Sequence, residues 1–183
     1  MIKRILVMVL VVVLLLPCSV EAKTVIKYTT PGKVALRDKA KGKAIIKVKC
    51  NTKLIILKKG KVWSKVQYKD QEYFIKNKWL NSQNSPKKYT RKKFKRAGRI
   101  RWRGKSWTWY TQRILPGRGL RIPGRHLDKN GFVCDKNDYI VLASSIGYKK
   151  QTKILPTPFG KFGKVYDTNG TWNYNWRDVY TNW

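Results

Sequence analysis

Two aspartates near the C-terminus are the first candidates for chemistry in this chain. Asp167 and Asp178 lie among Trp and Tyr residues in the segment GKVYDTNGTWNYNWRDVYTNW, residues 163–183. The chain has 42 Lys and Arg but only 9 Asp and Glu, so carboxylates are scarce and a pair in one segment is notable. A carboxyl group can donate and accept a proton, and flat rings beside it suit a sugar-binding groove. The pattern therefore indicates acid–base chemistry on a carbohydrate, with a purely structural role as the alternative.

Strand periodicity places the aromatic residues around Asp178. If residues 172–180 form one continuous strand, every second side chain points to the same face. A hairpin within this segment would break the alternation, and the rings could instead fill the domain interior. On the continuous strand, Asp178 is a candidate catalytic carboxyl, and we predict the rings on its face as substrate-binding residues: Trp172, Tyr174, Trp176 and Tyr180.

The protonation state of Asp178 depends on its surroundings. Burial raises the pKa of a carboxyl and nearby cations lower it, so the net charge of +33 works against an acid. On a strand, however, Arg177 points to the opposite face, and charges beyond about 8 Å are largely screened at physiological salt. Asp167 belongs to D-T-N-G, which is a turn signal in its own right, so we predict only a helper role in catalysis for it.

Metal, cofactor and thiol chemistry find little support. His126 is the only histidine, and GRHLDKNG around it has the composition of a polar turn, without a Cys or carboxylate cluster. We therefore expect no metal site, no cofactor and no Ser-His-Asp or Cys-His centre. Cys50 and Cys134 could form a disulfide outside the cell or could both be buried thiols, and the sequence leaves these alternatives open.

Residues 1–22 have the pattern of a secretory signal peptide. Two cations precede an apolar run at residues 5–16, and a V-x-A cleavage site ends at Ala22. No later stretch approaches the roughly 20 apolar residues of a membrane span, so we expect none in the mature chain. The sequence therefore predicts a secreted protein.

Residues 24–81 have the pattern of a small all-β domain. Short alternating runs rich in Val, Ile, Tyr and Trp are separated by Lys-Gly and Pro-Gly turns. The succession VALRD, AIIKVKCNTKLIIL, KKGKVWSKVQY and QEYFIKNKWL resembles a bacterial SH3-like domain, most specifically in W-x-K-V at residues 63–66 and in the closing WL. This resemblance implies a small barrel that binds the cell wall without catalysis. A spacer domain with Trp63 and Trp79 in its core is the alternative.

Residues 82–105 are predicted to be a basic linker or arm. Eleven Lys and Arg lie between Lys87 and Lys105, and like charges at this density resist packing. Such an arm suits an extracellular polyanion such as teichoic acid, although a solvated tether without a partner is also consistent. The predicted polyanion-binding residues are Lys92, Lys93, Lys95, Arg96, Arg99, Arg101 and Arg103.

Residues 106–183 form a second predicted all-β unit, with Gly or Pro at nearly every strand junction. The succession YIVLASS, YKKQTKILPTPFGKFGKVYDTNG and WRDVYTNW resembles the 3D domain, which is named for three aspartates. That domain belongs with the double-psi β-barrels, alongside rare lipoprotein A and membrane-bound lytic transglycosylase A. The resemblance spans about 45 residues and implies a double-psi β-barrel-like domain.

The resemblance also assigns the two aspartates. Asp167 in YDTNG matches the aspartate of the family's D-T-G-G segment, and Asp178 in RDVY matches that of its I-D-V-Y segment. In the lytic transglycosylases, the carboxylate at the Asp178 position is the proposed acid and base. The third family aspartate falls at Ser144 and Ser145, and TWNYN replaces the family's Gly-containing turn.

Taken together, the sequence predicts an all-β protein with an SH3-like barrel, a basic linker and a double-psi β-barrel-like domain. The expected function is a secreted, cell-wall-associated protein that binds peptidoglycan and cleaves or remodels its glycan strands. The alternative is a non-catalytic cell-wall or polyanion-binding adhesion protein, whose partners include teichoic acid. A secreted nucleic-acid-binding or membrane-active protein explains the charge but not the two carboxylates.

Overall fold

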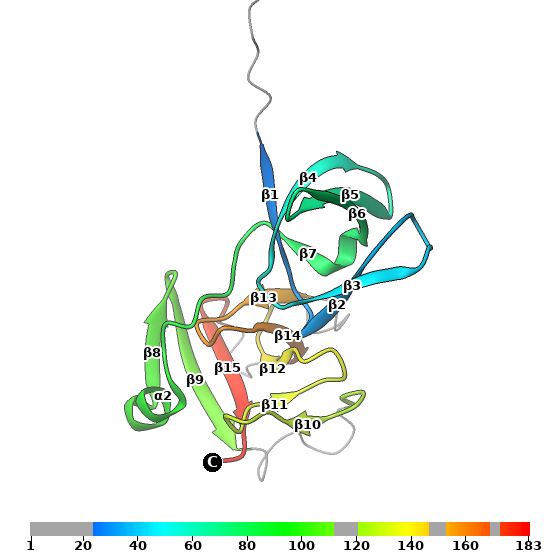
Figure 1. Cartoon of the computed structure of the whole chain (residues 1–183). Helices are drawn as coiled ribbons and strands as arrows, with labels where there is room; N and C mark the ends of the chain where they lie inside the picture. Colours follow the sequence, from blue (N-terminus) through cyan, green and yellow to red (C-terminus); the bar gives the residue numbers. More distant parts are fainter. Residues whose placement is uncertain (1–23, 112–120, 147–152, 169–172) are drawn as a thin grey trace, which may run out of the picture.

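The computed structural model describes residues 24–111, 121–146, 153–168 and 173–183. The predicted signal peptide, residues 1–22, lies outside them. The described chain is built almost entirely from two β-sheets, which confirms the predicted all-β class (Figure 1). Neither sheet closes into a barrel through its described strands, so the expectation of closed barrels is wrong in this respect.

The N-terminal sheet contains seven strands in the order β3-β2-β6-β5-β4-β1-β7. All of its strand pairs are antiparallel, as short strands joined by tight turns require. Alternating apolar side chains from these strands form one buried cluster around Leu36, Leu54, Val66 and Ile75. The elements are β1 Val25–Thr29, β2 Lys33–Arg37, β3 Ala44–Lys49, β4 Lys53–Lys59, β5 Trp63–Tyr68, β6 Gln71–Lys76, the 3-10 helix η1 Asn77–Trp79 and β7 Leu80–Asn81.

In the described residues, the C-terminal sheet contains eight strands, with β10-β11-β12-β15-β9-β8 as its main path, β14 beside β12 and β13 on the other side of β14. Two strand pairs are parallel, β9 with β15 and β12 with β14, and each joins segments that are far apart in the sequence. Apolar clusters lie on both faces of this sheet, which explains why β12 is buried along its whole length. Its elements are α2 Arg91–Ala97, β8 Arg99–Trp102, β9 Lys105–Thr111, β10 His126–Leu127, β11 Val133–Cys134, β12 Ile140–Ala143, β13 Ile154–Pro156, β14 Phe162–Asp167 and β15 Trp176–Thr181.

The basic segment is folded, so the prediction of an extended linker over residues 82–105 is wrong. Thr90 caps the start of α2 by accepting a hydrogen bond from the Lys93 amide, and Gly98 ends it with φ of 64°. Phe94 is fully buried and packs against Phe159 at 4.7 Å between ring centroids. Strand β8 then joins the C-terminal sheet beside β9. The cations point to solvent while a few apolar residues pack inward, which explains how so basic a segment folds.

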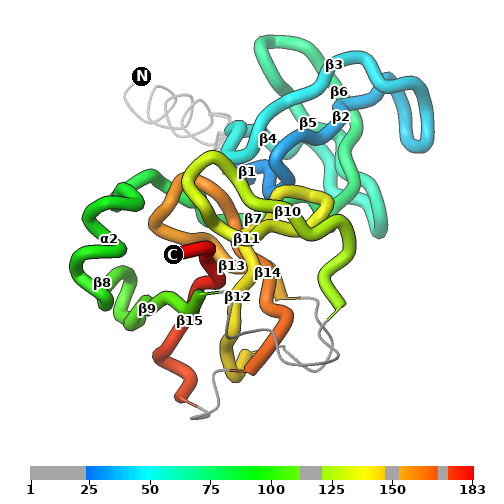
Figure 2. The backbone as a smooth tube through the Cα atoms, turned by 90° about the horizontal axis from the view of Figure 1, so that it is seen from below, coloured from blue at the N-terminus to red at the C-terminus, as the bar shows by residue number. Residues whose placement is uncertain are grey.

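Direct contacts join the two sheets, which lie side by side in both views (Figures 1 and 2). The Gly32 amide donates to the Asn137 carbonyl at 3.0 Å. The Asn51 side chain donates to the carbonyls of Ser85 and Gly160 and accepts from the Ser85 amide, at 2.8 to 2.9 Å. These polar contacts fix the N-terminal sheet against the loops around β14.

Two further expectations concern the membrane and the cysteines. Among the described residues, no helix has both the length and the apolar character needed to cross a membrane. Cys50 and Cys134 are both free thiols, so the disulfide alternative is not the one seen in the structure.

Candidate functional site

The two predicted aspartates lie in one row across five strands of the C-terminal sheet. Arg99 of β8 pairs with Thr108 of β9, and Thr108 pairs with Asp178 of β15. Asp178 pairs with Ala143 of β12, which also pairs with Asp167 of β14. The two aspartates therefore flank Ala143 at two strand spacings, roughly 10 Å between their Cα atoms. The parallel pairing of β9 with β15 brings together residues that are 70 positions apart in the sequence.

The carboxyl of Asp178 has the properties expected of a proton donor. Asp178 is 3% exposed, and the Thr108 hydroxyl donates a hydrogen bond to its Oδ1. Burial raises the pKa of Asp178, while the Thr108 hydrogen bond and the positive charge of Arg99 oppose the rise only in part. Arg177, its neighbour in the chain, pairs with Trp107 on the opposite face, as the alternation predicted.

Asp167 is a positioning residue in this arrangement. Its Oδ1 accepts the Thr168 amide at 2.8 Å, and its Oδ2 accepts the Tyr180 hydroxyl at 2.7 Å. Tyr180 is fully buried in a cluster with Tyr166 and Ala143. Because both oxygens of Asp167 have partners, the carboxylate orients Tyr180 and anchors the loop that follows β14.

The continuous strand on which the shared aromatic face depended is not formed, since the described part of residues 172–180 contains a turn. Strand β15 begins at Trp176, and a turn precedes it in which the Asn173 carbonyl accepts the Trp176 amide at 3.1 Å. Tyr174 lies in this turn and is 63% exposed, whereas Trp172 lies outside the described residues. Tyr180 is interior rather than part of a groove.

Among the predicted rings that the structure describes, Trp176 is the partly exposed one on the strand of Asp178. It is partly exposed and shares the face of Asp178, because it also pairs with a β9 residue two positions before Thr108. The Arg99 guanidinium lies over its ring at 4.6 Å from the centroid. A partly exposed indole and a stacked cation thus lie next to a buried acid.

The seven predicted polyanion-binding residues form an exposed basic surface over α2, β8 and the following turn. Register places Arg99 and Arg101 on the same face as Thr108 and Trp176. None of the seven forms an ion pair with another described residue. The basic surface therefore adjoins the site and extends away from it along α2; it consists of Lys92, Lys93, Lys95, Arg96, Arg99, Arg101 and Arg103, all of them exposed.

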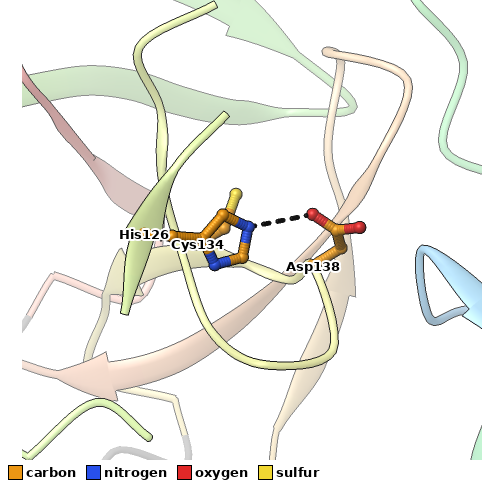
Figure 3. Close-up of side chains that lie close together, drawn as sticks. All are labelled: His126, Cys134 and Asp138. Carbon is orange, nitrogen blue, oxygen red and sulfur yellow. Dashed lines mark hydrogen bonds and ion pairs between the residues drawn. The ribbon is translucent and has the colours of Figure 1, made fainter. Parts of the chain in front are cut away.

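A second cluster of reactive side chains escaped the sequence analysis. His126, Cys134 and Asp138 bring potential metal-ligating atoms within 4.8 Å of one another (Figure 3). The β10–β11 hairpin pairs His126 with Cys134, and the Asp135 side chain accepts two backbone amides to form the turn that carries Asp138 back. The spacing H-x7-C-x3-D in a hairpin was the signal that could have revealed the cluster.

Lys161 joins this cluster in an ion-pair network. The Lys161 ammonium lies 3.3 Å from Asp138 Oδ1, 3.2 Å from Asp128 Oδ2 and 4.0 Å from Cys134 Sγ, so it already supplies the cation. Burial would raise the pKa of Asp138, but Lys161 and His126 together lower it. The cluster is therefore neutralised by its own side chains.

The ring of His126 is also unsuited to act as a ligand or a base. Both of its nitrogens face acceptors, with the Gly124 carbonyl 3.0 Å from Nδ1 and Asp138 Oδ1 3.2 Å from Nε2. The Gly124 hydrogen bond, aided by Asp138, raises the pKa of His126 and favours the imidazolium. Burial raises the pKa of Cys134 to about 12, so its thiol stays protonated at neutral pH. Neither a zinc ligand set nor a Cys-His nucleophile follows from this arrangement.

Comparison with protein-family models, with curated proteins and with solved structures found no match to this chain. The site is therefore defined by its own geometry. Sequence analysis found Asp178 and Trp176, which both lie on β15, and Asp167, which lies on β14. It missed Thr108, because WTWYTQ predicts a strand but does not reveal a parallel partner 70 residues later.

Proposed function

We propose that this protein is secreted, associates with the cell wall and cleaves or remodels peptidoglycan glycan strands, with Asp178 as the catalytic acid and base. The observation that carries the proposal is a buried carboxyl of raised pKa, beside the partly exposed ring of Trp176 on one sheet face. A raised pKa keeps a carboxylic acid protonated closer to neutral pH, as a proton donor requires.

A single carboxyl suffices for the proposed cleavage. Asp178 protonates the bridging oxygen as the glycosidic bond breaks and positive charge develops at the anomeric carbon. The 6-hydroxyl of the same sugar then attacks that carbon and returns a proton to Asp178, which leaves a 1,6-anhydro end. Asp167 is not needed as a nucleophile in this scheme, and its oxygens accept hydrogen bonds from the Thr168 amide and the Tyr180 hydroxyl. Thr108 orients the carboxyl of Asp178 through its hydroxyl.

In this proposal, the N-terminal sheet and the basic surface bind the protein to the cell wall. The N-terminal strands, whose order along the chain resembles a bacterial SH3-like domain, contact the catalytic half through Asn51 and Gly32. The basic surface over α2 and β8 offers cations to anionic wall polymers.

A second candidate function is non-catalytic binding of the wall, as in an adhesion protein. The 3% exposure of Asp178 favours it, since an acid that is largely covered must open to reach a glycan. The serines at the position of the family's third aspartate also favour it, because Ser144 and Ser145 are themselves buried.

Release of soluble fragments from purified peptidoglycan distinguishes the two functions. The mature chain is compared with Asp178→Asn and with Asp70→Asn, a matched loss of charge in an exposed turn with φ of 60° that Asn tolerates. We expect release by the wild type and by Asp70→Asn, and a loss of at least 100-fold in Asp178→Asn while co-sedimentation persists. Co-sedimentation of all three proteins without release would support the adhesion function instead.

A further inference from the structure

A cleft lies on the face of β15 opposite to Asp178. It has a volume of about 270 Å³ and is lined by Gln83, Trp102, Arg103, Lys105, Trp107 and Arg177, with two residues of β13. Register separates it from the proposed catalytic site, because Arg177 pairs with Trp107 while Asp178 pairs with Thr108. The mechanism proposed above uses none of these residues.

Arg177 is the central feature of this cleft. It is 4% exposed, and its Nη1 donates to the carbonyls of Tyr174 at 2.9 Å and Trp176 at 2.6 Å. No carboxylate among the described residues pairs with it, although these include eight of the nine acidic residues, all except Glu21. Burial lowers the pKa of its guanidinium, with no anion to compensate. A buried charge without a counter-charge is costly, which indicates that an external anion completes the site.

The remaining walls supply further donors and a flat surface. The Trp107 indole Nε1 is buried, and none of the described residues accepts a hydrogen bond from it. Arg103 stacks over the Trp102 ring at 4.4 Å from the centroid, and its guanidinium also reaches Gln83 and Asn84 at 3.2 to 3.3 Å. Lys105 is half-buried and donates to Asn175 Oδ1 at 2.7 Å. The cleft thus combines three cations with two indoles, and no acidic residue lines it.

We propose that this cleft binds an anionic sugar, meaning a single sugar ring that carries a carboxylate or a phosphate. The planar guanidinium of arginine matches the oxygens of either group in a bidentate geometry. The Trp102 ring, which carries the Arg103 guanidinium on one face, forms an aromatic wall of the cleft, and the volume lies just below the usual range of ligand pockets, which suits one ring. Arg103 and Lys105 lie at the more exposed part of the cleft and Arg177 is buried, and these three cations favour an anionic sugar over a neutral one.

Titration of the isotope-labelled mature chain tests the proposal and identifies the source of the anion. The probes are glucuronate for a carboxylate, glucose 6-phosphate for a phosphate and glucose as the neutral control. We expect saturable shifts of the Trp107 indole and Arg177 Nε resonances with one or both anionic probes and none with glucose. Absence of shifts with both anionic probes, or equal shifts with glucose, would overturn the proposal.

Charge-matched variants separate a built site from the general attraction of a basic protein. Arg103→Gln and Arg177→Met each remove one cation from the cleft, and Lys92→Gln removes one from α2. We expect at least tenfold weaker binding for the two cleft variants and a change within twofold for Lys92→Gln. Equal weakening by all three would show diffuse electrostatics and refute the site. Arg103 is exposed, so its variant keeps the test valid even if Arg177→Met does not fold.

Discussion

At the scale of single residues, Asp178 makes the stability of the protein depend on pH in an unusual direction. A carboxyl whose pKa is raised on folding binds its proton more tightly in the folded than in the unfolded chain. The free energy of unfolding therefore falls as the pH rises from about 4, the unfolded value, through the higher folded value. Ordinary salt-bridged carboxylates act in the opposite direction.

Asp178→Asn should remove the free-energy cost of a buried negative charge at neutral pH, while the shape of the side chain stays nearly the same. At pH 7 we expect the variant to have the same Tm as the wild type or a higher one, because the buried charge is gone while Oδ1 can still accept from Thr108. The difference in Tm between the variant and the wild type should disappear as the pH approaches 4. Thermal melts between pH 4 and 7 measure this difference. A variant that is less stable at every pH would instead assign Asp178 a structural role as an anion.

Thr108 should set the protonation of Asp178 directly. The Thr108 hydrogen bond lowers the pKa of Asp178 against the effect of burial, so Thr108→Val should raise this pKa further. Carbon-13 NMR of the side-chain carboxyl, followed through a pH titration, measures the shift. In the proposed enzyme, the basic limb of the pH–activity profile should move to higher pH in the same variant. An unchanged titration would show that the hydrogen bond does not act on the charged form.

At this scale the sequence predicted what depends on local alternation. The period of a strand predicted that Arg177 and Asp178 point to opposite faces of the sheet, and the strand register confirms this. Thr108 and Arg99 joined the site through strand pairings, which depend on tertiary packing and leave no local pattern.

At the scale of elements, α2 shows how a few apolar residues outweigh many like charges. Phe94 is fully buried against Phe159, so Phe94→Ala should cost about 3 kcal/mol in the free energy of unfolding. Lys95→Ala, on the exposed side of the same helix, should stay within about 0.5 kcal/mol. Urea denaturation monitored by tryptophan fluorescence gives both values. Equal and small losses would mean that the segment is the extended arm that the charge pattern predicted.

Charge composition misled the sequence prediction for this element because it ignores where the cations point. The position of Phe94 four residues after the capping Thr90 was visible in the sequence, but the Phe159 side chain that covers it was not. The start of β15 could not be predicted for a related reason. A local turn at residues 173–175 precedes the strand, although the sequence pattern around it alternates.

At the scale of the whole molecule, Asn51 is one of the polar links between the two halves. Its side chain makes three hydrogen bonds to Ser85 and Gly160, and its φ is 64°. Asn51→Gly preserves the left-handed backbone and removes all three bonds, so we expect a loss of about 3 kcal/mol in the free energy of unfolding.

Lys41→Gly is the matched control for this link, because Lys41 has φ of 65° in an exposed turn of the N-terminal sheet. We expect it to be neutral or slightly stabilising. Chemical denaturation of the two variants gives the comparison. Similar effects of both substitutions would mean that the hydrogen bonds of Asn51 contribute little to stability and that other contacts, such as Gly32 with Asn137, hold the two sheets together.

The fold class and the two all-β halves followed from strand periodicity and turn residues, which are local properties. The contact between the halves, the ion-pair network at Lys161 and the cleft at Arg177 did not, because each joins side chains from segments remote in the sequence.

The central claim is that Asp178 cleaves a glycan strand by proton transfer. The most direct measurement is mass spectrometry of the products released from purified peptidoglycan by the wild type and by Asp178→Asn. The proposal predicts fragments with 1,6-anhydro-muramyl ends from the wild type and their absence with the variant. Intact glycan with the wild type, or the same anhydro products from Asp178→Asn, would contradict it.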